Sequence, residues 1–373
     1  MGRIVILEPP GSREAYGGIS GGFLYNDRLG LLGSSDVTLG PEDLVLFDSL
    51  FWYSPEYLAT LPQVSANQPW GIILHGLPPD TGPLFESLGK TNLVILPSLW
   101  IARKFTQELK GWRPTYLVEE DLETESKFGL PRNLFPEILP LIVLYPGWDT
   151  HGPELLKPRR RTLPEKLEEY RFASLGRVSE GKGHNLAAEA LALLELPSWS
   201  WIAAGPGNRE LEHTIYKKLG SKFETPGTLP SEEVPDFLHT IDVLIQPSLA
   251  ETFSMAVYEA AAAGCGVVAL DRGGVSEALA LGQALRAEVE DEPSWRGRRS
   301  GILVTGDEDT SDSTRVLALS RGILEALEPV IEQSGLRPEP RPELQTLLSW
   351  EGRRRRLNFV VSLVLQSSFG GMT

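Results

Sequence analysis

The sequence has very little cysteine and no excess of positive charge. A single cysteine, Cys265, among 373 residues excludes an internal disulfide and a cysteine-based metal cage. The 35 lysines and arginines are outnumbered by 50 aspartates and glutamates, for a net charge of −15. Because neutralising nucleic-acid phosphates requires a basic face, nucleic acid is not expected as a partner, and bulk charge disfavours adsorption to an anionic membrane.

Long hydrophobic runs are missing as well. The first residues, MGRIVILEPPG, lead directly into a short strand and lack the apolar region and cleavage site of a signal peptide. The apolar run Phe359–Leu365 near the other end is far too short to cross a bilayer. We therefore expect a cytoplasmic protein. The basic run Arg353–Arg356 leaves peripheral contact with the inner membrane face, through an anionic lipid acceptor, as an open alternative.

The fingerprint of a dinucleotide-binding protein is also absent. The first predicted strand, residues 3–7, is followed by EPPGSREAYGG, which does not contain G-x-G-x-x-G. This argues against a dehydrogenase. Gly17, Gly18, Gly21 and Gly22 predict one glycine-rich loop after this strand, and the residues alone are consistent with a flexible turn.

Short apolar runs alternate with helical or loop segments in both halves of the chain. This alternation predicts α/β architecture, with parallel sheets covered by helices on both faces and ligands beyond the carboxyl ends of the strands. The predicted strands are residues 3–7, 44–47, 71–74, 93–96, 115–118 and 141–145, then 171–175, 200–204, 243–246, 267–270 and 301–304. A polar stretch rich in proline and arginine lies between the two sets and predicts a linker, so we place domains at 1–155 and 165–345.

The stretch from Asp242 to Glu277 predicts a strand, a loop, a short helix and a second strand. Ser254 can cap the helix with its side chain, and Gly264 can end it. The loop carries Glu251, and the otherwise small and apolar helix carries Glu259. Because burying an unpaired carboxylate costs several kcal/mol, these acids predict a polar partner, and a polyhydroxylated ligand would supply one.

Two further places hold candidate ligand-binding groups. Arg177 and Lys182 flank the glycine-containing turn that leads into a predicted helix, where both cations and free backbone N–H groups can converge on one anion. His75 follows the predicted strand 71–74. A lone histidine is more often structural, but the carboxyl end of a parallel strand favours a ligand contact.

The acidic stretch resembles the signature of a known group of enzymes. The spacing Glu251-x7-Glu259, with Pro247–Ser248 before it and AAAAG and the turn Asp271–Gly274 after it, is similar to the Glu-x7-Glu motif of retaining glycosyltransferases with the GT-B fold, family-four-like enzymes that use nucleotide sugars. The resemblance is specific between residues 176 and 277 and only topological before Trp148. Thr252 and Ser254 stand where the family commonly has glycines, and Gly266 where it commonly has proline.

The resemblance implies a fold, a reaction and a set of site residues. The fold is two Rossmann-like, doubly wound parallel-sheet domains facing a deep cleft, with an acceptor-binding first domain, a donor-binding second domain and a C-terminal helix, 349–373, that returns to the first. The reaction is sugar transfer from a UDP-, GDP- or ADP-sugar to a glycan, lipid or small-molecule acceptor. The implied catalytic residues are Glu251, Arg177, Lys182 and His75; the implied donor-binding residues are Gly17, Gly18, Gly205, Phe253, Ser254, Met255 and Glu259.

Neither a cofactor nor a metal is expected. Arg177, Lys182 and the N–H groups near Phe253 can neutralise the donor diphosphate, and the acidic triplet Asp307–Asp309 is interpreted as solvated surface. Two alternatives stay open. A sugar-nucleotide epimerase of the same fold would need acid and base carboxylates from the first domain, where the sequence shows no clear pair. A catalytically silent partner subunit would bind a nucleotide sugar without transferring it.

Overall fold

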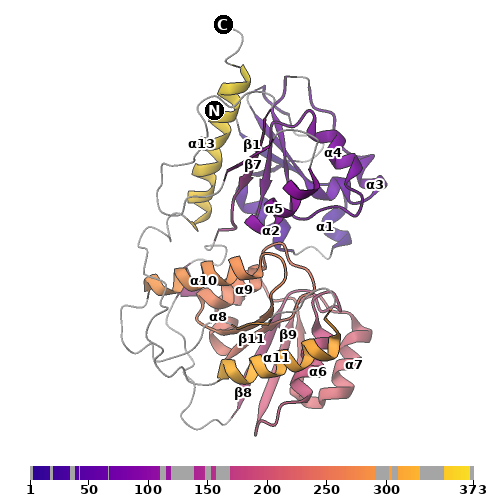
Figure 1. The fold of residues 1–373 in the computed structure, drawn as a ribbon, viewed down its shortest axis with the longest axis vertical. Helices are drawn as coiled ribbons and strands as arrows, with labels where there is room; N and C mark the ends of the chain where they lie inside the picture. Colours follow the sequence, from indigo (N-terminus) through magenta and orange to yellow (C-terminus); the bar gives the residue numbers. More distant parts are fainter. Residues whose placement is uncertain are drawn as a thin grey trace. The chain divides into compact units, whose positions relative to one another are not determined.

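The computed structural model describes residues 3–16, 20–33, 38–41, 43–65, 67–109, 115–118, 138–147, 153–156, 169–289, 302–304, 310–327 and 348–369. The chain divides into two compact units (Figure 1). The first unit combines Met1–Thr150 with Gln345–Thr373, and the second is His151–Leu344. Both units are built on a parallel sheet.

The first unit contains a seven-stranded parallel sheet with the order β2-β1-β3-β4-β5-β7-β6. Its strands are β1 (Ile4–Leu7), β2 (Leu31–Gly33), β3 (Leu44–Asp48), β4 (Trp70–Ile73), β5 (Leu93–Leu96), β6 (Thr115–Val118) and β7 (Leu139–Val143). The predicted strands 93–96 and 115–118 are confirmed to the residue. Strand β2 was not predicted, because three residues are too few to show a period of two.

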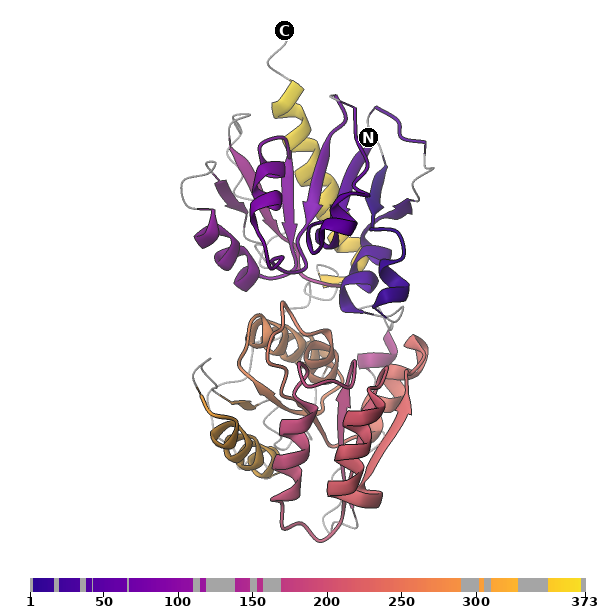
Figure 2. The ribbon, with the colours of Figure 1, turned by 90° about the vertical axis from the view of Figure 1, so that its right-hand side faces the viewer.

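Helices cover both faces of this sheet (Figure 2). Alternate strand residues form one apolar core with η1 (Ser49–Trp52), α4 (Gly82–Leu88) and α5 (Leu99–Glu108). The intervening residues form a second core with α2 (Gly21–Leu29) and α13 (Trp350–Phe369). Two short helices, α1 (Ser12–Ala15) and α3 (Pro55–Leu58), complete the described part of the unit. Strands buried on both faces explain the near-continuous apolar runs in the sequence.

Helix α2 corrects the prediction of one long glycine-rich loop. Residues 17–19 lie outside the described residues, but the chain is helical from Gly21 onward. The Ser20 hydroxyl accepts a hydrogen bond from the Phe23 N–H at 3.2 Å and so caps the helix. Gly22 lies close against the His75 ring, so tertiary packing offsets the low helix propensity of the glycines.

Helix α13 lies along the sheet of the first unit (Figures 1 and 2). Trp350, Leu357 and Val361 are almost fully buried against strand residues. The sequence spacing predicts one apolar stripe on this helix, formed by Leu357, Val360, Val361 and Val364, of which the side chains of Val360 and Val364 lie outside the described residues. We expect the basic run Arg353–Arg356 either at the chain crossing or on the surface; its first and last arginines are buried and its middle pair is exposed.

The second unit contains a six-stranded parallel sheet with the order β10-β9-β8-β11-β12-β13. Its strands are β8 (Tyr170–Leu175), β9 (Trp199–Ala204), β10 (Phe223–Gly227), β11 (Val243–Gln246), β12 (Gly266–Leu270) and β13 (Ile302–Val304). The flanking elements are η3 (Pro153–Leu156), α6 (His184–Ala192), α7 (Arg209–Leu219), η4 (Gly220–Lys222), η5 (Ser231–Glu233), α8 (Val234–Thr240), α9 (Met255–Ala262), α10 (Val275–Val289) and α11 (Asp312–Leu327).

The small residues of α9 have a packing reason. Helices α9 and α10 lie against each other, and a Cβ added at Gly282 of α10 would meet the Tyr258 carbonyl oxygen of α9 at 2.4 Å. Such close approach of two backbones requires glycine and small side chains at the contact.

Among the residues that the structure describes, no helix combines the length and the hydropathy needed to span a membrane.

Candidate functional site

Glycine contacts lock together the loops that follow neighbouring strands of the second sheet. A Cβ at Gly205, after β9, would meet the Gly176 carbonyl oxygen, after β8, at 2.0 Å. A Cβ at Gly183 would lie equally close to the carbonyl oxygen of Pro247, after β11. A Cβ at Gly273, after β12, would meet the Glu251 carbonyl oxygen at 1.6 Å.

These contacts join loops in the same order as the strands, so the carboxyl edge carries one continuous frame of backbone. Gly205, Gly183 and Gly273 all have positive φ, at 157°, 72° and 67°. Any other residue would combine a clash with an unfavourable backbone conformation.

Lys182 and Glu251 meet on this frame. Lys182 Nζ lies 2.6 Å from Glu251 Oε1, and the two side chains are 33% and 11% exposed. The Leu249 N–H donates to the Gly181 carbonyl at 3.0 Å and ties the two loops together beside the pair. Arg177 lies in the same loop as Lys182 and is exposed. The structure therefore brings together a cation and a carboxylate that are 69 residues apart in the sequence.

The start of α9 adds backbone N–H groups and one strained residue. Ser254 occupies the N-cap position with φ of 76°, in the left-handed region that favours glycine. Its hydroxyl makes no capping hydrogen bond, so the prediction of a side-chain cap is wrong: a left-handed backbone differs from the extended conformation that a serine cap uses. Phe253 is buried and Met255 is partly buried, while Glu259 is 5% exposed one turn further on.

His184 supports the loop that carries Lys182. It is 1% exposed at the start of α6, and its ring stacks on Trp201. Its Nδ1 lies 3.4 Å from the Ser179 nitrogen, and the Ser179 hydroxyl accepts from the Lys182 N–H at 3.3 Å. Burial lowers the pKa of His184 to about 4. The sequence offered no signal for this residue beyond its position after the glycine turn.

This buried imidazole leads to a prediction about acid stability. The unfolded chain binds a proton at His184 as pH falls through 6.5, whereas the folded chain binds it only near pH 4, so stability is lost across that interval. The loss at this one site is about 3 kcal/mol. His184→Asn keeps an acceptor for Ser179. Between pH 6.5 and pH 4 its free energy of unfolding, measured with urea, should fall by about 3 kcal/mol less than that of the wild type. Equal pH dependence in both proteins would contradict the buried neutral state.

Polar side chains also gather at the carboxyl ends of three neighbouring strands of the first sheet. Glu8 follows β1, Asp48 ends β3, and His75 comes shortly after β4. Asn26 of α2 links them: its amide donates to Asp48 Oδ2 at 2.6 Å and to Glu8 Oε1 at 2.9 Å, and its Oδ1 lies 2.9 Å from His75 Nε2. Asp48 and Asn26 are fully buried.

The hydrogen bonds of Asn26 assign the tautomer of His75. Both amide protons go to carboxylates, so the amide oxygen must accept, and His75 Nε2 carries the proton. Burial lowers the pKa of His75, partly opposed by Asp48, and burial raises the pKa of Asp48. The Leu50 N–H also donates to Asp48 at 2.8 Å. His75 is therefore an oriented imidazole with Nε2 as its donor, and its burial favours the neutral form.

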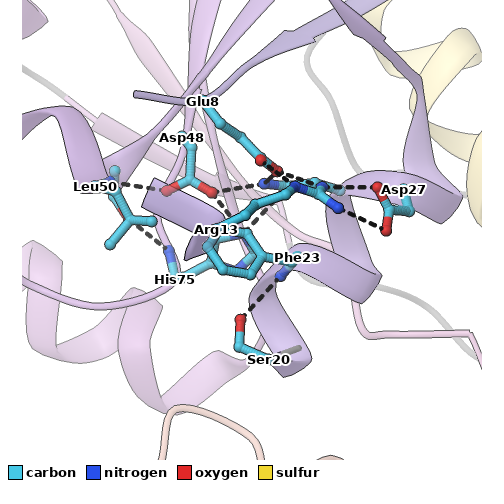
Figure 3. A network of polar contacts seen from close by, with 10 residues as sticks. Glu8, Arg13, Ser20, Phe23, Asp27, Asp48, Leu50 and His75 are labelled. Atoms are coloured by element: carbon cyan, nitrogen blue, oxygen red, sulfur yellow. Dashed lines mark hydrogen bonds and ion pairs between the residues drawn. The ribbon is translucent and has the colours of Figure 1, made fainter. Parts of the chain in front are cut away.

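Arg13 completes this network (Figure 3). Its guanidinium donates two hydrogen bonds to Glu8, the shorter at 2.6 Å, and two to Asp27, the shorter at 2.7 Å. It also lies 5.0 Å from the centroid of the Phe23 ring. The two carboxylates, each accepting two hydrogen bonds from the guanidinium, and the neighbouring Phe23 ring hold Arg13 in one orientation. Sequence reasoning missed Glu8 and Asp48, because only the order of the strands brings them to His75, and it missed Arg13, because its contacts with Glu8 and Asp27 are tertiary.

The predicted site residues fall into separate groups. Arg177, Lys182, Gly205, Glu251 and the residues at the start of α9 lie along the carboxyl edge of the second sheet. His75 lies at the carboxyl edge of the first. Gly17, Gly18 and the triplet Asp307–Asp309 are outside the described residues. Within the described ranges, no group of three or more histidine, cysteine, aspartate or glutamate side chains is arranged to hold a metal ion.

Two doubly wound parallel sheets, each with candidate ligand-binding residues at its carboxyl edge, define a protein of the GT-B fold. Comparisons with known proteins agree. Residues 157–296 match the family model described as glycosyl transferases group 1. A curated D-inositol 3-phosphate glycosyltransferase of Corynebacterium urealyticum is 29% identical over 188 residues, which is 45% of this chain and 44% of that protein. A curated 2-deoxystreptamine glucosyltransferase of Streptomyces kanamyceticus is 29% identical over 110 residues, so the chain matches less than half the length of these relatives, 44% and 28%.

Solved structures agree in fold at low identity. A glycosyltransferase from Rickettsia africae is 14% identical with a TM-score of 0.58, and the match covers 98% of this chain and 99% of that one. A sucrose-phosphate synthase from Thermosynechococcus elongatus is 16% identical with a TM-score of 0.54, covering 87% and 74%. The predicted GT-B fold and the predicted resemblance to glycosyltransferases of that fold are confirmed. The family model and the curated relatives are named for glycosyl transfer.

Proposed function

We propose that this protein transfers a sugar from a nucleoside-diphosphate sugar to a hydroxyl of a glycan, lipid or small-molecule acceptor, with retention at the anomeric carbon. The observation that carries the proposal is the Lys182–Glu251 pair, 2.6 Å apart on the glycine-locked loops of the second sheet. A cation and a carboxylate held side by side match a donor whose diphosphate is anionic and whose sugar offers hydroxyl donors.

In this proposal the second unit stabilises the leaving group. Cleavage of the bond between the anomeric carbon and the diphosphate develops negative charge on a phosphate oxygen, and positioned cations and backbone N–H groups lower the energy of that state. Arg177, Lys182 and the N–H groups at the start of α9 are the groups assigned to it. Glu251 accepts hydrogen bonds from sugar hydroxyls, and Glu259 from the ribose.

The first unit would supply His75 and the acceptor site. His75 is oriented by Asn26, and its partly exposed ring is assigned a contact with the donor sugar. Glu8 is held by Arg13 and Asn26, while Asp48 accepts from Asn26 and Leu50. These carboxylates are engaged in orienting the imidazole, which is a poor arrangement for the acid and base of an epimerase.

The experiment that tests the proposal is a donor panel followed by chelation. UDP-, GDP- and ADP-sugars are compared by thermal shift on the purified full chain, because a ligand at 100 times its Kd adds about 2.7 kcal/mol to stability. The donor that shifts the melting temperature should then be hydrolysed or transferred at an unchanged rate in EDTA, since protein cations neutralise the diphosphate.

Two outcomes would contradict this proposal. Complete loss of activity on chelation, restored by Mg²⁺ or Mn²⁺, would overturn metal independence and return attention to Asp307–Asp309. A donor that stabilises the protein but is neither hydrolysed nor transferred with any acceptor class would favour the silent partner subunit.

A further inference from the structure

Three aromatic rings, those of His75, Tyr25 and Trp350, contact one another in a row, edge to face, beside the strand ends of the first unit. We refer to this row as the His75–Tyr25–Trp350 stack. The Tyr25 ring lies edge-on to the His75 imidazole, at a centroid distance of 5.4 Å, and edge-on to Trp350, at 5.3 Å. Tyr25 and Trp350 are 2% and 3% exposed, whereas the His75 side chain is 18% exposed. The Tyr25 hydroxyl donates to the Leu144 carbonyl at 2.8 Å and anchors the middle of the stack.

Glycines lie against both ends of the His75–Tyr25–Trp350 stack. A Cβ added at Gly22 would meet the His75 ring at 3.3 Å, which is tighter than an ordinary contact. At the other end, a Cβ added at Gly147 would meet the Trp350 ring at 2.6 Å, so one of the two would have to move. The rings therefore have little room to shift along the stack.

The orientation of His75 depends on one face of α2. Gly22, Tyr25 and Asn26 are three and four residues apart and so lie on the same side of the helix. Asn26 holds the Nε2 edge of the imidazole, while Gly22 and Tyr25 contact the ring. Trp350, on α13, lies against Tyr25.

We propose that Tyr25 and Trp350 are positioning residues that hold the His75 imidazole in the orientation needed for sugar transfer. Helix α13, more than 270 residues after His75 in the chain, would then complete the part of the site carried by the first unit. The effect on transfer rests on the proposed function, but the effect on the imidazole itself does not. Tyr25 and Trp350 act through His75 and need not touch a substrate.

The first test is a kinetic cycle with a matched control. Tyr25→Leu and Trp350→Leu should lower kcat by about 10-fold or more through misplacement of His75, with donor KM changed by less than about twofold. Tyr25→Phe keeps the ring and should retain most of the activity. Phe105→Leu removes a buried ring on the opposite face of the same sheet and should leave kcat unchanged. In a His75→Ala background, Tyr25→Leu should have no further effect.

The second test reads the imidazole directly and needs no activity. Nitrogen NMR of histidine-labelled protein, assigned with His75→Gln, should show His75 protonated on Nε2 in the wild type. The charged groups that face it are Asp48, and Glu8 through Asn26. Tyr25→Leu and Trp350→Leu should give mixed tautomers and, as water enters, a pKa closer to 6.5. Gly147→Ala, which keeps every ring but displaces Trp350, should do the same if a leucine variant fails to fold.

The two tests separate the possible failures. An unchanged tautomer and pKa of His75 in all of these variants would overturn the positioning role, whatever the kinetics show. Equal losses of kcat in the wild-type and His75→Ala backgrounds would show that the stack only stabilises the fold. Altered NMR signals in a protein that transfers no sugar would uphold the positioning and refute the proposed function instead.

Discussion

Lys182→Ala is expected to lower kcat/KM for sugar transfer by about 10²–10³, the loss seen when one group that stabilises developing charge is removed. Lys182 is fixed on one side by its 2.6 Å contact with Glu251 and on the other by the glycine-locked turn between β8 and α6. The alanine variant removes a cation from the diphosphate and also leaves the Glu251 carboxylate without this lysine. Arg177→Ala should give a loss of the same order, since it lies in the same loop.

A second lysine–glutamate pair in the same unit provides the control. Lys218 pairs with Glu189 on the surface between α6 and α7, and both side chains are more than one third exposed. Lys218→Ala should therefore change kcat/KM by less than about twofold, because exposed pairs contribute little. A folded Lys182→Ala protein with a loss below about threefold would show that Lys182 is only a surface charge.

Removing residues 349–373 is expected to leave the first unit unable to stay folded. Trp350, Leu357 and Val361 are each 3% exposed or less within the core that they share with β1, β3, β4, β5 and β7. Burying an apolar side chain of this size stabilises the fold by about 1.5–3 kcal/mol. The sum over three such side chains is comparable with the total stability of a domain, about 5–15 kcal/mol. The truncated protein should precipitate or melt at a much lower temperature.

Point variants on the same helix separate burial from the mere presence of the tail. Leu357→Ala should destabilise the protein by about 2–5 kcal/mol. Phe359→Ala should stay within about 0.5 kcal/mol, because that ring is 47% exposed. A truncated chain that keeps both full activity and the wild-type melting temperature would refute the docking of this helix.

Sequence reasoning was most accurate where burial imposes a local period. The strands 93–96, 115–118 and 243–246 agree with the structure to the residue. Strands β2 and β10 were missed, because one has three residues and the other contains proline and glycine. Helix α2 was hidden by its two leading glycines, whose packing against His75 is a tertiary contact.

The sequence by itself determined the fold class, the number of sheets and the types of side chain available for chemistry, because alternation of apolar runs, turn glycines and motif spacing are local properties of the chain. Which side chains meet was decided only by tertiary structure. The order of the first sheet brings Glu8, Asp48 and His75 to one edge, and the return of α13 places Trp350 against Tyr25. These contacts join residues tens to hundreds of positions apart, and their free energy comes from non-local packing that no short window of sequence records.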